Sequence, residues 1–388
     1  MFESLAASLT QRREQGLYRQ RRIVDSPQNV KMLIDGQTLI NFSSNDYLGL
    51  ANHSDVVKAL QQGAQQYGAG SGAAHLICGH SRPVHDLEEA LAEFCGRQRA
   101  LIFSTGYMAN IGIVTALLGR HDGVFEDRLN HASLIDAGQF SGASFQRFRH
   151  ADTSQLEEQL IASQARQKLI ISDGVFSMDG DIAPLPSIVQ LAEQHDAWLM
   201  VDDAHGFGVL GKNGSGCAEH FALSQEQLPI LMGTFGKAFG TFGAFVAGSD
   251  TLIEYLINEA RSYVYTTALP PAIAVATLAS LKLLQQQTWR REKLQDLIRK
   301  FRQGVTEIGL QLMDSDTPIQ PIVIGEAASA VRMSDALMAK GFYVGAIRPP
   351  TVPKGSARLR VTLSAVHSES DINRLLEALS IVSREMNV

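Results

Sequence analysis

The chain has 388 residues, of which 45% are hydrophobic and 19% charged, and its formal net charge is −6. That length gives room for two or three domains with a substantial core. No block of Lys and Arg suggests a nucleic-acid surface, and no apolar run approaches the roughly 18 residues that span a bilayer. We therefore expect neither nucleic acid nor a membrane among the partners.

The first fifteen residues have the pattern of a short amphipathic helix. Glu3 is an acid at the third position, and no apolar segment followed by a cleavage site is present, which argues against a signal peptide. Cys78, Cys95 and Cys217 are odd in number and form no CxxC pair, which argues against a disulfide framework or a zinc site built on them. We expect no metal and a reducing, cytoplasmic location.

Short apolar runs alternate with helical patterns through most of the chain. Residues 31–42 indicate a hairpin that turns at Asp35-Gly36, and amphipathic helices follow at about 54–67 and 83–96. Further apolar runs are expected to be strands: 100–103, 168–172, 197–201, 229–233 and 243–248. Such runs, separated by helices, are typical of a mostly parallel sheet covered on both faces. This α/β architecture places ligands at the carboxyl ends of strands.

A second region begins after a long helix expected at roughly 270–287. Its segment 357–364 alternates, with apolar residues on one face and Arg358 and Arg360 on the polar face. A half-buried strand of this kind indicates a smaller C-terminal domain. The expected division is 1–50 for an N-terminal helix and hairpin, 51–280 for a large domain and 281–388 for a small one.

Polar residues follow several of the expected strands. STGYMAN (104–110) is a turn that opens a helix, and its free N–H groups favour a phosphate, although any strand-to-helix turn is rich in Ser, Thr and Gly. Asp202 and His205 follow another strand and could face one pocket. An acid at this position can bind a metal, hold a ring nitrogen or merely cap the next segment.

Lys237 stands in TFGKAFG (234–240), directly after an apolar strand. Because burying an ammonium is costly, a lysine there is either solvated in a loop or activated to form a Schiff base with an aldehyde. The flanking glycines would let the backbone approach a bulky cofactor. A phosphate turn, then an acid, then a lysine supply in that order what pyridoxal 5′-phosphate needs. Together they predict this cofactor, bound to Lys237.

Longer segments carry a resemblance to a known family. They are NFSSNDYLGL (41–50), HASLIDA (131–137), DGVFSMDGDIAPL (173–185), VDDAHGFGVLG (201–211), TFGKAFG (234–240) and AIRPPTVPKGSARLRVTLSA (346–365). In these segments the chain resembles the α-oxoamine synthases, pyridoxal-phosphate enzymes of the aspartate-aminotransferase fold, and the likeness runs from about residue 9 to 380. It implies a large domain with a mostly parallel sheet and a smaller α+β C-terminal domain.

The resemblance also implies roles for residues around the cofactor. Lys237 would hold the cofactor and remove the Cα proton of the amino acid, Asp202 would pair with the pyridinium nitrogen, and His131 would stack on the ring. His205 and Ser177 would form hydrogen bonds around the phenolic oxygen. The phosphate end is expected to involve Gly106, Tyr107, Thr234 and, from a partner subunit, Thr266 and Thr267. A site shared between subunits implies a homodimer.

Other residues are implied in substrate binding. Arg360 resembles the arginine that clamps the amino-acid carboxylate, because a planar guanidinium fixes the orientation of a carboxylate, and Arg348 is a second candidate. An ion pair is the alternative for these arginines, and it is favoured for Arg358. Arg19 and Thr351 would lie along the acyl substrate. Asn45, within NFSSNDYLGL, and His131, which would assist at the thioester or ketone oxygen, complete the set.

The implied reaction condenses L-alanine with a pimeloyl thioester of CoA or an acyl carrier protein, with loss of CO2, as in biotin biosynthesis. The alternatives are a sister activity such as glycine C-acetyltransferase, a simple aminotransferase on the same fold, and a non-catalytic subunit. The presence of Lys237, Asp202 and His131 argues against the last. Residues 72–79 depart from the family pattern, because they lack its usual small polar run and arginine near the expected thioester entrance.

Overall fold

The structure, a computed structural model, describes residues 2–15 and 17–386. The chain forms two compact units. The large unit consists of Leu48–Ser177 and Ile182–Arg291, and the small unit of Met1–Tyr47, Met178–Asp181 and Glu292–Val388. The three-domain division predicted from the sequence stays a prediction.

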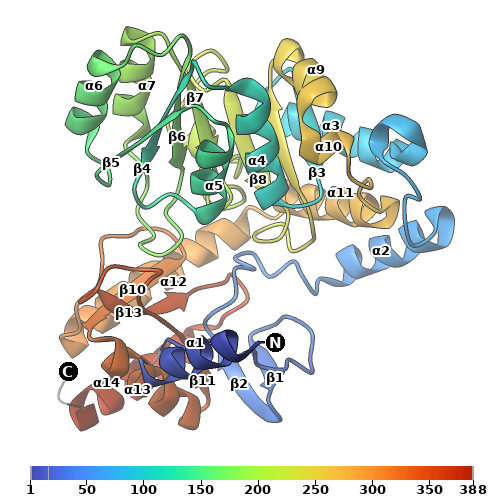
Figure 1. Cartoon of the computed structure of the whole chain (residues 1–388). Coiled ribbons are helices and arrows are strands. Elements are labelled where there is room, and N and C mark those ends of the chain that lie inside the picture. The colour runs from blue at the N-terminus through green and yellow to red at the C-terminus, as the bar shows by residue number, and fades with distance from the viewer. Residues whose placement is uncertain (1, 16, 387–388) are drawn as a thin grey trace. The chain divides into compact units, whose positions relative to one another are not determined.

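A seven-stranded sheet forms the centre of the large unit (Figure 1). Its strands are β3 (Arg99–Phe103), β4 (Gly123–Asp127), β5 (Ser144–Phe148), β6 (Lys168–Asp173), β7 (Ala197–Asp202), β8 (Ile230–Thr234) and β9 (Ala244–Gly248). They lie in the order β3-β9-β8-β7-β6-β4-β5, and the pairings are parallel except those of β9 with β3 and β8. The mostly parallel α/β fold is confirmed. The sequence pattern does not indicate β4 and β5.

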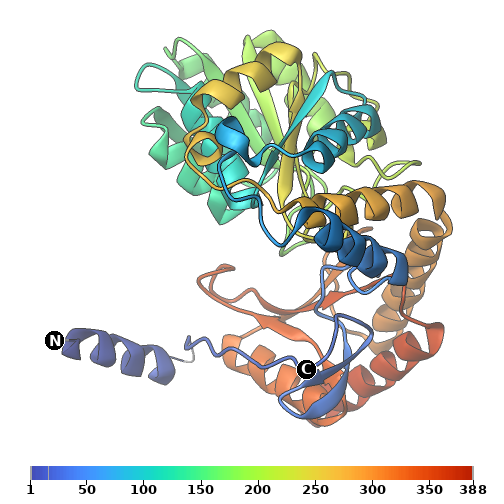
Figure 2. The same cartoon turned by 90° about the vertical axis from the view of Figure 1, so that its right-hand side faces the viewer.

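Helices cover both faces of this sheet, as the apolar runs predict. The helical elements of the large unit are α2 (Ser54–Tyr67), the π-helix η1 (His75–Gly79), α3 (Arg82–Cys95), α4 (Gly106–Leu117), α5 (Ala132–Phe140), α6 (Thr153–Ala162), α7 (Leu185–Gln194), α8 (Cys217–His220), α9 (Asp250–Glu259), α10 (Arg261–Val264) and α11 (Pro271–Gln286). Side chains alternate along a strand, so Leu101 packs in the core under α4, α5 and α9 while its neighbour Ile102 is buried on the opposite face. The helices α2 and α11 lie side by side (Figure 2), and Gly63 allows the close approach because a Cβ there would lie 2.9 Å from Ala272 Cα.

The carboxyl ends of three neighbouring strands each carry a polar side chain. Asp173 and Asp202 end β6 and β7 and are paired in register, and Thr234 ends β8. Parallel strands end at one edge of a sheet, so these residues share that edge. The α4 N-terminus, which follows β3 after a short turn, begins at Gly106.

The small unit contains two three-stranded sheets with the orders β1-β2-β11 and β10-β13-β12. Its elements are α1 (Glu3–Glu14), β1 (Lys31–Ile34), β2 (Gln37–Asn41), α12 (Trp289–Ile308, which begins in the large unit), β10 (Ile319–Gly325), α13 (Ala327–Ala339), β11 (Phe342–Tyr343), β12 (Gly345–Ile347), β13 (Ala357–Thr362) and α14 (Glu369–Met386). The predicted hairpin is confirmed as β1 and β2. Its turn residues Asp35 and Gly36 have φ values of 48° and 77°, the left-handed pair that a two-residue hairpin turn requires.

The predicted N-terminal helix is present as α1 (Figure 2). Its apolar side chains are spread around the helix rather than gathered on one face, so the amphipathic pattern predicted for it is wrong. Leu5 and Leu9 are 56% and 44% exposed.

The strand β13 carries the arginines of the predicted alternating segment. All six of its residues are buried, so the prediction of a half-buried strand is wrong. Arg358 forms an ion pair with Asp179, which is the interpretation that the sequence favours for this arginine. A buried arginine needs such a partner because an unpaired buried charge costs several kcal/mol, on the order of 3–5.

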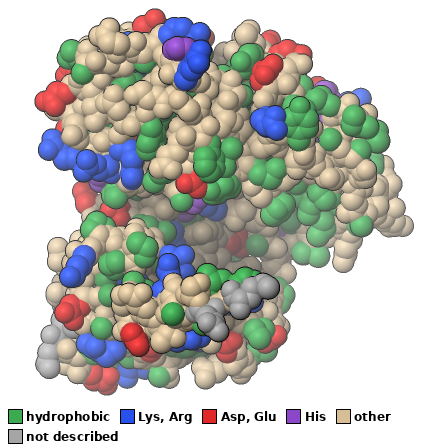
Figure 3. Space-filling view, in the orientation of Figure 1, with side chains coloured by type: hydrophobic (Ala, Val, Ile, Leu, Met, Phe, Trp, Pro, Cys, Tyr) green, Lys and Arg blue, Asp and Glu red, His purple; other side chains and the backbone are tan. Residues whose placement is uncertain are grey.

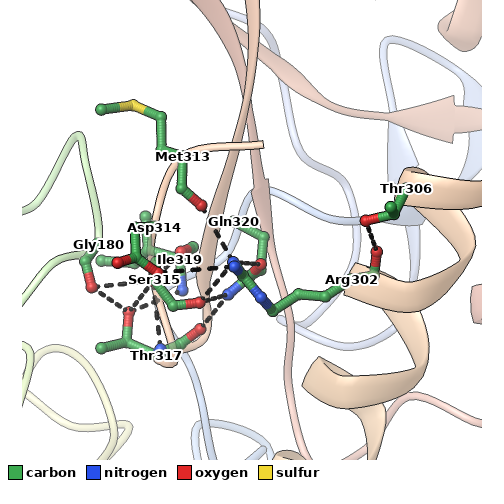
Figure 4. A network of polar contacts seen from close by, with 9 residues as sticks. All are labelled: Gly180, Arg302, Thr306, Met313, Asp314, Ser315, Thr317, Ile319 and Gln320. Carbon is green, nitrogen blue, oxygen red and sulfur yellow. Dashed lines mark hydrogen bonds and ion pairs between the residues drawn. The ribbon is translucent and has the colours of Figure 1, made fainter. Parts of the chain in front are cut away.

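A polar network holds the short segment around Gly180 in the small unit (Figure 4). The hydroxyls of Ser315 and Thr317 both donate to the Gly180 carbonyl, each at 2.9 Å. Arg302 of α12 donates to the Ser315 carbonyl at 2.8 Å and to the Gln320 side-chain oxygen at 3.1 Å. The loop that carries Ser315 and Thr317 is therefore hydrogen-bonded both to the segment around Gly180 and to α12.

Charged side chains of both signs occur on each unit in the face drawn in Figure 3, in keeping with the net charge of −6. Among the described residues, no helix combines the length and apolar character that crossing a membrane requires.

Candidate active site

A chain of hydrogen bonds begins at Asp202, the last residue of β7. Its Oδ2 accepts from Asn110 Nδ2 at 2.7 Å and its Oδ1 from the Ala204 N–H at 3.0 Å. The same Asn110 amide donates to Ser133 Oγ at 2.8 Å, and Ser133 Oγ lies 2.7 Å from His131 Nδ1. One side-chain amide of α4 thus connects the carboxylate at the sheet edge to an imidazole at the start of α5.

His131 is the N-cap residue of α5, and this position fixes its ring. Its Nδ1 accepts from the Ser133 N–H at 3.3 Å, and its own backbone N–H donates to Asp173 Oδ2 at 2.8 Å. An accepting Nδ1 leaves the proton of the neutral imidazole on Nε2. Desolvation by the surrounding protein lowers the pKa of His131, the Lys237 ammonium adds to this effect, and the Asp202 carboxylate opposes it.

Lys237 lies in the turn between β8 and β9 and is half-buried. Its charge acts on His131 and also on Asp173, whose pKa is raised first by burial and then by the Asp202 carboxylate. Lys237, Asp202, Asp173 and His131 therefore lie within electrostatic reach of one another. A carboxylate, an amine and a neutral imidazole at one sheet edge can hold a cationic ring and exchange a proton beside it.

The two glycines that flank this lysine differ in what surrounds them. Gly240 has φ +67°, and a Cβ there would lie 2.3 Å from the Ala51 backbone nitrogen. Gly236 meets nothing closer than Thr234 Oγ1 at 3.8 Å. The prediction that glycines admit a bulky cofactor stays open at Gly236, whereas Gly240 is required by the approach of the 50–51 backbone.

The residues predicted to bind the cofactor phosphate form different local hydrogen bonds. Gly106 is the first residue of α4, and Tyr107 donates its hydroxyl proton to the Asp136 carboxylate. Thr234 Oγ1 donates to the Gly243 carbonyl at 2.9 Å and accepts from the Gly236 N–H at 3.3 Å.

The threonine pair Thr266-Thr267 lies beside the segment that departs from the family pattern. Thr267 forms a β-bridge with Ala74, and the next residue, Ala268, donates its N–H to the Ala73 carbonyl at 2.9 Å. The side chain of Ser71 donates to the Ala268 carbonyl at 2.6 Å. Residues 73 and 74 of that segment are therefore bonded directly to the backbone at residues 267 and 268.

The remaining large-unit candidates follow strands that end at the same edge. Ser177 is half-buried in the loop after β6, and His205 is buried in the loop after β7. The acid next to Asp202 has a different task, because Asp203 is buried and accepts the Cys217 N–H at 2.6 Å. Of the two adjacent acids, one caps a loop and the other faces the Asn110 amide.

Five of the six residues predicted to bind substrate belong to the small unit, and the sixth, His131, belongs to the large unit. Arg360 donates to Asn45 Oδ1 at 3.2 Å and to Thr362 Oγ1 at 3.0 Å, so the structure brings Arg360 and Asn45 together. Arg348 donates to the Tyr18 carbonyl at 2.8 Å, and the Thr351 N–H donates to the Arg348 carbonyl at 3.1 Å. Arg19, next to Tyr18 in the chain, and Thr351 are both exposed.

Comparison with known proteins identifies the family. The model for "Aminotransferase class I and II" matches residues 37–379. An 8-amino-7-oxononanoate synthase of Pseudomonas savastanoi pv. phaseolicola is 61% identical over 379 residues, which cover 98% of this chain and 96% of the relative. The chain belongs to the class I and II aminotransferase family, among its 8-amino-7-oxononanoate synthases.

Solved structures from this family share the fold over nearly the whole chain. A serine palmitoyltransferase from S. paucimobilis with a bound PLP–myriocin adduct has a TM-score of 0.94 and is 30% identical, covering 100% of this chain and 98% of its own. An 8-amino-7-oxononanoate synthase from Francisella tularensis has a TM-score of 0.79 and is 34% identical, covering 90% and 99%.

Within this family fold, the network contains residues that the sequence reasoning does not single out. They are Asn110, Ser133 and Asp173. Asp173 follows its strand just as Asp202 does, so the same rule could have found it. Asn110 offers a weaker signal, a polar side chain on a mostly apolar helix, and this side chain is fully buried in the structure.

Proposed function

We propose that this protein catalyses the decarboxylative condensation of L-alanine with a pimeloyl thioester, giving 8-amino-7-oxononanoate, CO2 and the free carrier, in biotin biosynthesis. The observation that carries the proposal is the connected set Asp202–Asn110–Ser133–His131 with Lys237 in electrostatic reach. The 61% identical relative bears the name of this activity.

The residues at the sheet edge fit pyridoxal 5′-phosphate. Asp202 is 5% exposed, and the two donors that reach its oxygens, Asn110 and Ala204, are neutral amides. A buried carboxylate favours a cationic partner, and a protonated pyridine nitrogen is one. When bound, the cofactor supplies an aldehyde that combines with amines and a ring that accepts an electron pair.

Lys237 is assigned two tasks in the reaction. Its Nζ would hold the cofactor through the aldehyde group, and Nζ would accept the proton from the Cα of L-alanine. A lysine amine serves as nucleophile and base only when it is unprotonated.

Other side chains orient the reactants. His131, with its proton on Nε2, would stack on the ring and donate to the thioester oxygen, while His205 and Ser177 would form hydrogen bonds with the phenolic oxygen. Gly106, Tyr107 and Thr234 would bind the phosphate together with Thr266 and Thr267 of a partner subunit. The functional unit is therefore a homodimer, and the free thiols of the three cysteines in each chain fit a reducing cytoplasm.

The small unit supplies the substrate contacts in this proposal. Arg360 holds the carboxylate of L-alanine, and its bonds to Asn45 and Thr362 fix the guanidinium plane. Arg348, Thr351 and Arg19 serve the pimeloyl chain. Holding the carboxylate decides which Cα bond is aligned for cleavage, first C–H and later C–CO2.

The direct test is mass spectrometry of the product from L-alanine with either pimeloyl-CoA or pimeloyl acyl carrier protein. We expect a mass equal to 8-amino-7-oxononanoate, and no product from Lys237→Ala. Lys282→Ala, which changes an exposed lysine of α11, is the matched control and should retain activity. Product formation by Lys237→Ala would contradict the role of this lysine, and the absence of product with both thioesters would contradict the reaction.

A sister α-oxoamine synthase activity is the second candidate, because serine palmitoyltransferase structures reach a TM-score of 0.94. Turnover with alanine, glycine and serine, each paired with acetyl, pimeloyl and palmitoyl thioesters, separates them. We expect alanine with the pimeloyl thioester to be preferred. A preference for glycine with acetyl-CoA would establish a glycine C-acetyltransferase instead.

A further inference from the structure

Three side chains of the large unit converge outside the proposed active site. His85 and Glu88 lie three positions apart on α3 and therefore share one helix face. His80 follows η1 and adjoins residues 72–79, the segment that departs from the family pattern. His80 Nε2 lies 3.2 Å from His85 Nδ1 and 3.9 Å from Glu88 Oε2. The ligand atoms of all three residues lie within 4.8 Å of one another.

Each of the three side chains is also held by its other polar atom. His80 Nδ1 lies 3.4 Å from His75 Nδ1, and His85 Nε2 lies 3.4 Å from Glu89 Oε1. The second oxygen of Glu88, Oε1, accepts the backbone N–H of Ile102 at 2.9 Å. Metal-binding histidines are usually oriented in this way, by a carboxylate or another acceptor at the nitrogen that faces away from the ion.

We propose that His80 Nε2, His85 Nδ1 and Glu88 Oε2 bind one Zn²⁺ ion. Zinc takes two imidazoles and a carboxylate readily, with bonds of about 2.0–2.2 Å in a tetrahedron, so neighbouring ligand atoms lie about 3.3 Å apart. The 3.2 Å separation already matches this, and the 3.9 Å separation needs a small shift of Glu88. All three side chains line a cavity of about 410 Å³, which is also lined by Leu76 and Tyr263.

The site would join the segment after η1 to α3. Residues 73–74 of that segment pair with Thr267 and Ala268, so the ion would brace the stretch that carries the predicted phosphate threonines. The cluster itself contains no residue assigned to the reaction. Its occupancy is therefore measured as metal binding, independently of whether the proposed condensation is correct.

The experiment is a zinc titration of the purified holoenzyme after dialysis against a chelator, with a chromogenic competitor to report free zinc. We expect one ion per chain with a micromolar or lower dissociation constant, and a rise in melting temperature on saturation. His80→Asn removes a ligand and should weaken binding at least about 100-fold, beyond the 10–100-fold typical of losing an orienting partner. Cobalt in place of zinc should give the visible absorption of a four-coordinate site.

Glu89→Gln keeps the test decisive if His80→Asn fails to fold. It changes an exposed side chain that only orients His85, and it should weaken zinc binding about 10-fold. Glu93→Gln, at another exposed position of α3, is the matched control and should bind like wild type. The proposal is overturned if wild type binds no zinc, or if Glu89→Gln and Glu93→Gln bind it equally and His80→Asn, where folded, does too.

Discussion

Asn110 shows how much of a site can depend on one uncharged side chain. Both hydrogens of its amide are used, one on Asp202 and one on Ser133, and the residue is fully buried. A leucine would suit the apolar core under α4 equally well, but it would leave Asp202 with the Ala204 N–H alone. The asparagine fixes the carboxylate and, through Ser133, the tautomer of His131.

We expect Asn110→Ala to weaken cofactor binding and to lower kcat/KM by about 10- to 150-fold, because a hydrogen bond to a charged group contributes about 1.5–3 kcal/mol. The measurements are the cofactor dissociation constant of the apoprotein and steady-state kinetics. Asn258→Ala, which removes an exposed asparagine of α9, is the control. Equal cofactor affinity in the two variants would show that the Asn110 amide does not support Asp202.

His367 is a buried histidine with a fixed tautomer in the small unit. Its Nδ1 accepts the Ser364 N–H and its Nε2 donates to the Asn41 carbonyl, both at 2.9 Å. Burial lowers the pKa of His367, and the Lys293 charge adds to this, while the Asp371 carboxylate and the Asn41 carbonyl oppose it. Below pH 6.5 the histidine takes up a proton in the unfolded chain but not in the folded protein. Protonation therefore stabilises the unfolded chain, and the free energy of unfolding decreases as the pH falls.

We expect wild type to lose about 1 kcal/mol more stability than His367→Gln between pH 7.5 and pH 5.5, within the limit of about 1.4 kcal/mol per pH unit below the ordinary pKa. Glutamine keeps one donor and one acceptor but cannot be protonated. Urea titration of both apoproteins at the two pH values gives the difference. Parallel losses in the two proteins would remove His367 as the cause.

In the turn that carries Lys237, the two glycines offer a matched comparison. Alanine at Gly240 would take a left-handed conformation, which costs about 1–2 kcal/mol, and would press on the backbone at Ala51, which adds about 1–3 kcal/mol. We expect Gly240→Ala to lower the free energy of unfolding by about 2–5 kcal/mol in a denaturant titration. Gly236→Ala should stay within about 0.5 kcal/mol of wild type.

The affinity of each alanine variant for pyridoxal phosphate then shows whether the glycine serves cofactor binding or only the fold. If Gly236 admits the cofactor, Gly236→Ala binds pyridoxal phosphate more weakly although its stability is normal. Stability that is normal in Gly240→Ala would show that the 50–51 backbone can move aside.

The ion pair between Arg358 and Asp179 ties the segment 178–181 to β13. Arg358→Met leaves a buried carboxylate without its cation, and we expect a loss of about 3–5 kcal/mol. Adding Asp179→Asn removes that charge and should restore part of the loss, which a double-mutant cycle in urea measures. Additive losses would contradict the coupling. The kinetic control is that Arg358→Met should leave the KM for L-alanine unchanged, whereas Arg360→Met should raise it.

Sequence patterns predict a strand well when its buried residues are apolar. Segments such as 168–172 and 197–201 are continuous apolar runs, and both are central strands. The sequence pattern does not indicate β4 because this strand ends in two acids, Glu126 and Asp127. Both acids are nevertheless buried, and burial raises the pKa of Glu126 to about 8. An acid that is protonated in the fold looks like a surface residue in the sequence.

The same limit applies to the candidate site. Lys237 and Asp202 stand directly after apolar strands, a local signal that the sequence carries by itself. Asn110 and Ser133 matter only because α4 and α5 pack together, and no local pattern reports that contact. The burial of β13 on both faces is likewise a tertiary fact, since its alternation is that of a half-exposed strand.

At the scale of the whole molecule, the proposed homodimer leads to a quantitative prediction for the activity of mixed dimers. Thr266 and Thr267 are proposed to complete the phosphate site of the partner, so each site would draw on two chains. In a closed dimer with twofold symmetry, the same exchange occurs at both sites. Two inactive variants that affect different halves of the composite site should then complement each other.

We therefore expect activity when Lys237→Ala is co-expressed with the double variant Thr266→Val/Thr267→Val. In a mixed dimer, one site receives both lesions and the other receives none. About half of the dimers are mixed and each has one intact site, so the preparation should reach about a quarter of wild-type turnover. Activity no higher than that of the separate variants would show that each chain completes its own site, and a monomer by light scattering would rule out sharing altogether.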